Sequence, residues 1–222
     1  MTQDIAAAAA RILLETKAVM VNIDEPFTYT SGKRGPVYVD CRRLISFPEA
    51  RSQLMDFGAQ ILKKLDVDYV AGGETAGIPY AAFIAERLNK PMLYIRKKPK
   101  GFGRMSQIEG FMEGENPHVA LIEDVQNFGV SVKVFVDALR VAGARIEHLF
   151  VIFHYGHESS QQNMRDMGIH LHALTSWKDI LRVARAEKYF DEETASSVEE
   201  FLANADQWAA DRGFAPVLKE QA

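Results

Sequence analysis

Apolar, strand-like runs alternate with amphipathic helical segments through the middle of this chain, and that order most restricts its fold. The runs have few polar breaks, which is typical of strands buried on both faces of a parallel sheet. Helices are expected over residues 78–89 and 131–143, and strands over 68–73, 91–97, 118–124, 146–155 and 169–174. This alternation predicts an α/β fold with a doubly wound, mostly parallel sheet, where ligands bind beyond the carboxyl ends of the strands.

Two segments flank the predicted α/β core, which covers residues 65–175. Residues 1–45 combine a helix with strand-like and turn-like parts and form an N-terminal hood. Residues 176–222 supply C-terminal helices, and two helices are expected over 177–211. The second helix has an apolar stripe typical of a packing face. The side chains expected to pack there or in the core are Trp177, Val198, Phe201, Leu202, Ala205 and Trp208. The 222 residues suit a single domain.

Charge and cysteine content limit the partners of such a chain. The net charge is -4, whereas a generic nucleic-acid binder is usually basic, so no nucleic-acid partner is expected. The single cysteine, Cys41, suits a reducing compartment and argues against a cysteine-rich zinc site. No apolar run approaches ~20 residues, so no membrane span is expected. Residues 1–20 lack the cationic start of a secretion signal. These features predict a cytoplasmic protein.

Two adjacent acids, Glu123 and Asp124, close the apolar run at 118–124. The turn that follows opens a helix, where unpaired backbone N–H groups and the helix dipole favour a phosphate. The two carboxylates can accept hydrogen bonds from neighbouring hydroxyl groups. A diol beside a phosphate is a phosphoribosyl group, so the stretch indicates a sugar-phosphate site. An acid pair alone could also simply end a strand.

Three other segments of the chain also carry residues typical of a ligand-binding site. GGETAGIPYAA, at 72–82, follows a strand and opens a helix, and its alternative interpretation is a plain glycine turn. RKKPKGFGRMSQIEG, at 96–110, holds five basic residues among glycines and a proline. It predicts a mobile basic loop that could neutralise a departing pyrophosphate rather than a solvated helix face. FTYTSGKRGPVYVDCRRLISFP, at 27–48, could cover a ligand or form a hairpin without a ligand role.

Together the four segments resemble the type I phosphoribosyltransferases, and most specifically the orotate phosphoribosyltransferases. The 119–131 stretch is similar to their signature for phosphoribosyl pyrophosphate (PRPP), and 72–82 to their pyrophosphate loop, which often contains a non-proline cis peptide. The 96–110 stretch resembles their catalytic loop, which reaches the neighbouring subunit and so implies a homodimer. In the amino-terminal segment that covers the nucleobase, the matching residues are Phe27, Ser31, Gly32, Pro36, Tyr38, Asp40 and Arg42.

The resemblance implies transfer of the phosphoribosyl group of PRPP to orotate, giving orotidine 5'-phosphate and pyrophosphate in de novo pyrimidine (UMP) biosynthesis. It implies Mg²⁺ held by ligand and water oxygens, with no direct protein ligand. The implied catalytic residues are Lys97, Lys100 and Asp124. The implied PRPP-binding residues are Glu74, Thr75, Ala76, Gly77, Arg96, Lys97, Lys100, Glu123, Asp124, Asn127, Phe128, Gly129, Val130 and Ser131. The implied orotate-binding residues are Thr30, Tyr38, Asn127 and Tyr155.

The chain departs from the family pattern at several positions. Phe128 stands where a threonine hydroxyl usually meets the 5'-phosphate, and losing that bond to a charged group costs about 1.5–3 kcal/mol. Asn127 and Val130 also differ from the usual residues, and Phe102 replaces a loop histidine. Tyr155, with the preceding histidine, replaces an Asp-Arg pair that meets the orotate carboxylate. The residues that could replace that arginine are Lys33, Arg34, Arg42 and Arg43.

Three alternatives follow from these departures. The chain could be a catalytically impaired protein that binds PRPP or a nucleotide on the same fold. It could act on another nucleobase, although the amino-terminal segment and the basic loop favour orotate. An RNA-binding regulator would account for the basic loop, but the net charge of -4 opposes it.

Overall fold

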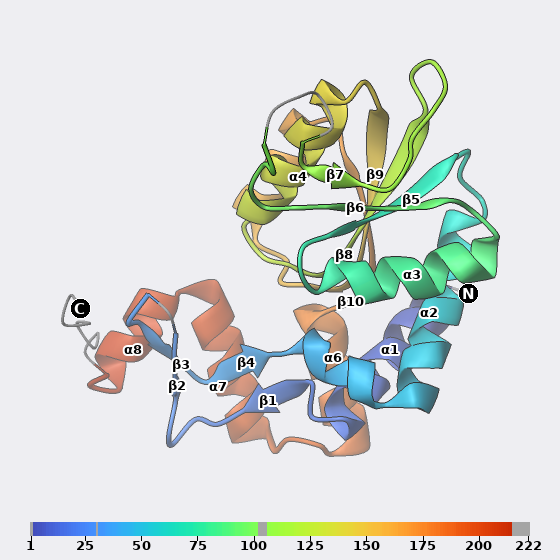
Figure 1. Cartoon of the computed structure of the whole chain (residues 1–222). Helices are drawn as coiled ribbons and strands as arrows, with labels where there is room; N and C mark the ends of the chain where they lie inside the picture. The colour runs from blue at the N-terminus through green and yellow to red at the C-terminus, as the bar shows by residue number, and fades with distance from the viewer. Residues whose placement is uncertain (1, 30, 102–105, 215–222) are drawn as a thin grey trace.

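A six-stranded sheet forms the centre of the molecule in the computed structural model, which describes residues 2–29, 31–101 and 106–214. The strand order is β10-β9-β8-β5-β6-β7 (Figure 1). The strands are β5 (Tyr69–Gly73), β6 (Met92–Ile95), β7 (Ile108–Glu109), β8 (His118–Gln126), β9 (Arg145–His154) and β10 (His170–Ser176). All neighbours pair in parallel except β7, which is antiparallel to β6 at the edge. The predicted doubly wound, mostly parallel sheet is confirmed.

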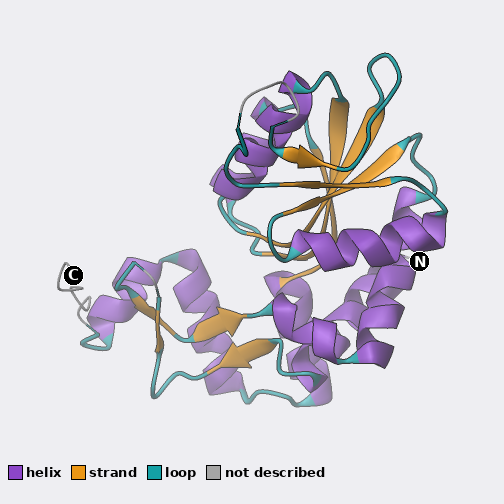
Figure 2. Ribbon diagram, viewed as in Figure 1, coloured by secondary structure: helices purple, strands orange, loops and turns teal. Residues whose placement is uncertain are grey.

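Helices cover both faces of this sheet (Figure 2). The helices α1 (Thr2–Glu15), α2 (Pro48–Leu62) and α3 (Gly77–Leu88) pack on one face, and α4 (Val130–Val141) and α5 (Glu158–Asp166) on the other. Two separate apolar clusters fill the layers, one containing Ile84 of α3 and the other Phe135 of α4. All five residues of β5 are buried, which is why its sequence shows no polar alternation.

The part of the predicted hood that follows α1 packs beside the C-terminal helices (Figure 1). It holds the antiparallel pair β1 (Val19–Val21) and β4 (Val37–Val39), and the hairpin β2 (Phe27–Thr28) and β3 (Arg34–Gly35). The short 3₁₀ helix η1 (Cys41–Ser46) leads from β4 into α2. The hairpin lies against α8, so residues far apart in the sequence meet (Figure 1).

The C-terminal part contains three helices, so the prediction of two helices over 177–211 is wrong. They are α6 (Trp177–Glu187), α7 (Glu192–Ala203) and α8 (Ala205–Asp211). The expected apolar stripe is divided because Asn204 ends α7 and its side chain accepts a hydrogen bond from Gln207 N as the cap of α8. Trp177 and Trp208 are both buried, which confirms their place in the core.

The sequence analysis predicted neither helix α2 nor helix α5 nor the 3₁₀ helix η1, and it also missed strand β7. Its two residues end the basic segment, and so short a strand has no periodic signal. No helix among the described residues is long and apolar enough to cross a membrane.

Candidate functional site

The acid pair lies at the carboxyl end of β8, in the centre of the sheet. Glu123 is only 6% exposed, and its Oε1 atom has no hydrogen-bond partner among the described residues. A Cβ atom on Gly73 would lie 1.8 Å from this oxygen, and one on Gly77 would lie 2.9 Å from it. The glycines on either side of the β5–α3 turn therefore allow that turn to approach the Glu123 carboxylate closely.

Burial disfavours the charged form of both acids. Burial raises the pKa of Glu123 well above its ordinary value, Asp124 raises it further, and Lys97 acts in the opposite direction. Burial also raises the pKa of Asp124, although backbone N–H donors and the charge of Arg42 partly offset this. The pair is thus poorly solvated, and Glu123 Oε1 lacks a donor among the described residues, a state that hydroxyl groups of a bound sugar would relieve.

Replacing Glu123 with glutamine should stabilise the free protein at neutral pH. The folded-state pKa lies above the ordinary value of 4.5, so the folded chain holds the proton more tightly and wild-type stability falls as pH rises from about 4.5 to the raised pKa. Glutamine does not ionise, so the stability advantage of Glu123→Gln should grow across that window and vanish below it. Denaturant unfolding at several pH values measures this. Exposed Glu115 provides the control, because Glu115→Gln should follow the wild-type profile; equal stabilities at pH 7 would contradict the assignment.

The β5–α3 turn holds the start of the basic segment beside the acid pair. The Glu74–Thr75 peptide bond is cis, as the resemblance implied for this loop. The Glu74 carboxylate accepts a hydrogen bond from Lys97 N at 2.7 Å, and Glu74 N donates to Ile95 O at 2.9 Å. Thr75 is exposed and Ala76 half-buried, ahead of buried Gly77 at the start of α3. Two of the predicted ligand-binding segments are therefore joined directly at one strand end.

The basic segment forms an arm that connects β6 to β7. Arg96 N donates to Gln107 O at 2.8 Å, and Lys100 N donates to Ser106 O at 2.7 Å, so the two sides of the arm run together. The Lys97 and Lys100 side chains are exposed, whereas Arg96 forms an ion pair with Glu109 at 3.3 Å. The predicted departure at Phe102 lies outside the described residues.

The predicted phosphate loop runs from β8 into α4. Gly129 has a φ of +82°, a left-handed conformation that glycine adopts without strain, and Val130 begins the helix. The first N–H groups of a helix have no intrahelical acceptor, so those at Val130 and Ser131 suit an anion. Asn127 contributes a buried Oδ1 atom without a partner among the described residues. The backbone part of a phosphate site is therefore present.

The Phe128 ring lies against the β9–α5 connection. It is 55% exposed and stacks on His157, with ring centroids 5.0 Å apart and planes 3° from parallel. His157 stacks in turn on Tyr155 at 5.9 Å. Asn163 Nδ2 donates to Phe128 O at 3.2 Å and anchors the loop to α5. The aromatic substitution thus exchanges a phosphate-binding hydroxyl for a contact with the neighbouring loop.

A buried polar network beneath the phosphate loop escaped the sequence analysis. Ser160 Oγ donates to Gln126 Oε1 at 3.0 Å, and His154 Nε2 lies 3.1 Å from the same hydroxyl. Ser160 lies 34 positions after Gln126 and 6 positions after His154. No local sequence pattern links the three residues. Through its contact with Ser160, His154 therefore supports the base of the loop.

The predicted nucleobase residues come from the hood and from the end of β9. Tyr38 lies on β4. Burial raises the pKa of Tyr155, and the Tyr38 phenol adds a smaller electrostatic effect in the same direction. Asn127 lies on the phosphate loop, at the neighbouring strand end. Thr30 lies outside the described residues. The structure therefore places Tyr38 of the hood within electrostatic range of Tyr155 at the end of β9.

Four basic hood residues were candidate partners for a substrate carboxylate, and each of them has another contact in the structure. Lys33 pairs with Asp206 at 2.6 Å, Arg34 lies over the Phe214 ring at 4.8 Å, and Arg43 donates to Thr16 O at 2.7 Å. Arg42 pairs with Asp40 at 2.9 Å. Its charge also lowers the pKa of Asp124, a member of the acid pair. Arg42 is therefore the best placed of the four.

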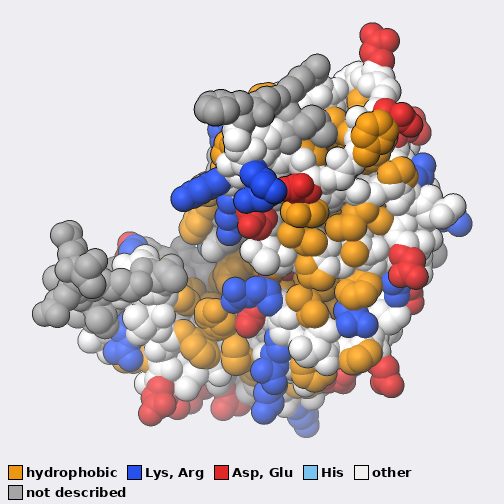
Figure 3. Space-filling model, viewed as in Figure 1, with side chains coloured by type: hydrophobic (Ala, Val, Ile, Leu, Met, Phe, Trp, Pro, Cys, Tyr) orange, Lys and Arg blue, Asp and Glu red, His pale blue; other side chains and the backbone are white. Residues whose placement is uncertain are grey.

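The surface is hollowed between the sheet core and the hood, and basic side chains lie beside the hollow (Figure 3). The strand ends that carry the acid pair, the glycine turn and the phosphate loop face the hood across this region. A doubly wound sheet with this arrangement at its carboxyl edge has the architecture of a type I phosphoribosyltransferase.

Comparisons with known proteins narrow this class to one family. No protein-family model matches the chain. It is 49% identical over 214 residues to an orotate phosphoribosyltransferase of Agrobacterium fabrum, covering 94% of this chain and 92% of that protein. The structure of orotate phosphoribosyltransferase from Aeropyrum pernix is similar, with a TM-score of 0.65, 30% identity, and coverage of 78% and 97%. Leishmania donovani UMP synthase has a TM-score of 0.76 at 24% identity, covering 89% of this chain and 42% of that one. The chain belongs to the orotate phosphoribosyltransferase family.

Proposed function

We propose that the protein transfers the phosphoribosyl group of PRPP to orotate, a step of de novo pyrimidine biosynthesis. The observation that carries this proposal is the meeting of three segments at one sheet edge. The acid pair, the glycine turn at Glu74 and the basic arm at Lys97 are joined there by short contacts. In this arrangement the acid pair matches a sugar diol, and the glycine turn matches a pyrophosphate. The basic arm supplies positive charge for the pyrophosphate.

The proposed reaction forms a bond between an orotate nitrogen and the ribose C1 atom while the bond from C1 to pyrophosphate breaks. Glu123 and Asp124 hold the ribose hydroxyls, and residues 125–131 hold the 5'-phosphate through backbone donors. Residues 74–77 bind the pyrophosphate, and Lys100 stabilises its developing charge. Tyr38, Tyr155 and Arg42 orient the orotate, with Arg42 meeting its carboxylate. The protein thus contributes alignment and charge rather than covalent chemistry.

The oxygen atoms at this edge fit a magnesium complex of PRPP. Mg²⁺ prefers oxygen ligands and keeps several waters, and the buried Glu123 carboxylate offers an unpartnered oxygen nearby. When bound, Mg²⁺ would neutralise pyrophosphate charge. We expect ligand and water oxygens to coordinate it, with Glu123 and Asp124 orienting the ribose rather than ligating the metal directly.

The proposal also includes a homodimer in which the basic arm reaches the neighbouring subunit. The exposed Lys100 side chain, which lies further along the antiparallel arm than Lys97, supports this arrangement. We further propose a cytoplasmic location, which the buried free thiol of Cys41 supports.

Loss of orotate absorbance in the presence of PRPP and Mg²⁺ tests the activity. We expect turnover by the wild type, and a loss of about 10²–10³-fold in Asp124→Asn, because the neutral amide no longer provides the carboxylate that holds the ribose. Calorimetric PRPP binding is measured on the same samples. Binding without turnover of orotate or another nucleobase would favour a ligand-binding protein, and turnover of another base alone would change the substrate.

A further inference from the structure

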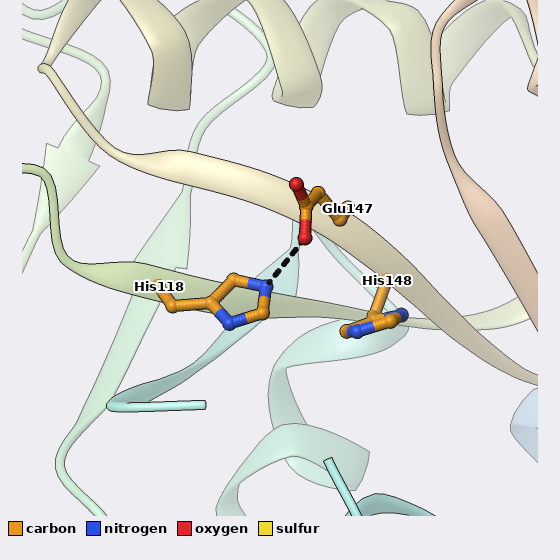
Figure 4. Close-up of side chains that lie close together, drawn as sticks. All are labelled: His118, Glu147 and His148. Carbon is orange, nitrogen blue, oxygen red and sulfur yellow. Dashed lines mark ion pairs between the residues drawn. The ribbon is translucent and has the colours of Figure 1, made fainter. Parts of the chain in front are cut away.

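Four of the six histidines gather at the amino-terminal ends of the strands, opposite the proposed active site. His118 begins β8, His148 lies near the start of β9, and His170 and His172 lie at the start of β10. The His148 ring lies between 5.2 and 5.6 Å from those of the other three. Figure 4 shows His118 and His148 on adjacent strands with the Glu147 carboxylate directed at His118.

A β-bulge accounts for the placement of two consecutive potential ligands. Val119 pairs with Ile146 and Ala120 with His148, so Glu147 is the extra residue of β9. Side chains alternate between the faces of a regular strand, but a bulge redirects one of them. Glu147 and His148 can therefore both approach His118, and one ligand atom from each of the three residues lies within 4.8 Å of the others.

The hydrogen bonds of His118 leave one ring nitrogen available for a ligand bond. Its Nδ1 contacts Asp66 O, so a proton on Nδ1 leaves the lone pair on Nε2. Nε2 is buried without a hydrogen-bond partner in the described parts of the chain and lies 3.6 Å from Glu147 Oε2. A metal-binding histidine usually has this arrangement, donating its second nitrogen to a backbone carbonyl.

Surrounding groups both oppose and favour a cation. The guanidinium of Arg145, which can only donate, lies 3.0 Å from His118 Nδ1, so it competes with Asp66 O for this nitrogen and disfavours nearby positive charge. Glu147 supplies a negative charge, and Asp68 Oδ2 adds another where it accepts from His118 N at 2.8 Å.

We propose that His118, Glu147 and His148 form a binding site for a divalent transition-metal ion of the zinc type, separate from the magnesium that accompanies PRPP. Two imidazoles and a carboxylate are established zinc ligands, whereas Mg²⁺ prefers oxygen alone. Tetrahedral ligands at ~2.1 Å from zinc lie about 3.4 Å apart, so a small side-chain rotation completes the site. Glu147 and His148 are partly exposed and can make it. His172 Nε2 lies 3.2 Å from His148 Nδ1 and orients that ring as a positioning residue.

Zinc titration of the full-length, metal-free protein by calorimetry tests the site, with metal analysis after dialysis. We expect one Zn²⁺ per chain and no competition from Mg²⁺. Glu147→Gln and His148→Gln should each weaken binding by more than 100-fold, and His172→Gln by roughly 10- to 100-fold. The orotate assay with Mg²⁺ gives an independent readout, because these residues lie at the opposite end of the strands from the proposed active site.

The matched control is His170→Gln, which removes an imidazole of the same cluster from outside the proposed ligand set. It should leave zinc affinity within a few-fold of wild type. Circular dichroism and thermal unfolding of each metal-free variant separate loss of a ligand from loss of the fold. Absence of zinc binding to the folded wild type, or an equal loss in His170→Gln and His148→Gln, would overturn the proposed site.

Discussion

Replacing Lys100 with alanine is expected to lower kcat by about 10²–10³-fold while PRPP affinity changes little. The ammonium group is exposed on the arm that begins at the acid pair, so it can approach the pyrophosphate when the arm closes. Its charge matters most when the bond to pyrophosphate breaks, and a group that acts mainly in the transition state affects turnover more than binding. Steady-state kinetics and calorimetric PRPP titration measure the two effects separately.

Lys98 provides a matched control, because it is an exposed lysine two positions earlier on the same arm. Lys98→Ala should keep turnover within a few-fold of wild type. Mixing chains that carry Lys100→Ala with chains that carry Asp124→Asn tests whether the arm acts between subunits. A hybrid dimer would contain one intact site and recover part of the activity. No recovery in confirmed hybrids would restrict the arm to its own subunit, and unchanged turnover in Lys100→Ala would remove it from the mechanism.

Replacing Phe128 with threonine is expected to strengthen PRPP binding by roughly 10- to 150-fold, the equivalent of a hydrogen bond of 1.5–3 kcal/mol to a charged group. The wild-type ring stacks on His157, whereas a threonine hydroxyl at this turn would add a side-chain donor to the backbone donors beside it. Isothermal titration with PRPP and Mg²⁺ measures the affinity, and kinetics should show a lower KM for PRPP.

Phe128→Leu separates the added hydroxyl from removal of the ring. It should lose the stack on His157, about 0.5–1.5 kcal/mol of stability, without gaining PRPP affinity. Equal gains in the two variants would show that the ring obstructs the ligand and that the hydroxyl is irrelevant. No gain in either would mean that the backbone donors already satisfy the phosphate and that Phe128 is a neutral substitution.

Both of these predictions concern segments that the sequence alone indicated as parts of the site. The acid pair, the glycine turn and the basic arm follow predictable strands, and parallel strands bring their carboxyl ends to one edge. The strand runs therefore predicted the shared edge, whereas the adjacency of β8, β5 and β6 in the sheet brings the three segments into contact. Strand β7 was missed because two residues are too few to show a periodic pattern. The division between α7 and α8 was missed because it lies at a single residue, Asn204.

The sequence by itself determined the α/β class, the parallel core and the chemical types at the candidate site, because continuous apolar runs and local turn motifs encode them. The direction of individual side chains depended on tertiary structure. Phe128 turns toward His157, Glu123 is enclosed by Gly73 and Gly77, and the β9 bulge brings Glu147 toward His118. These contacts join residues from separate elements, and their geometry arises from packing and strand register, which no local pattern specifies.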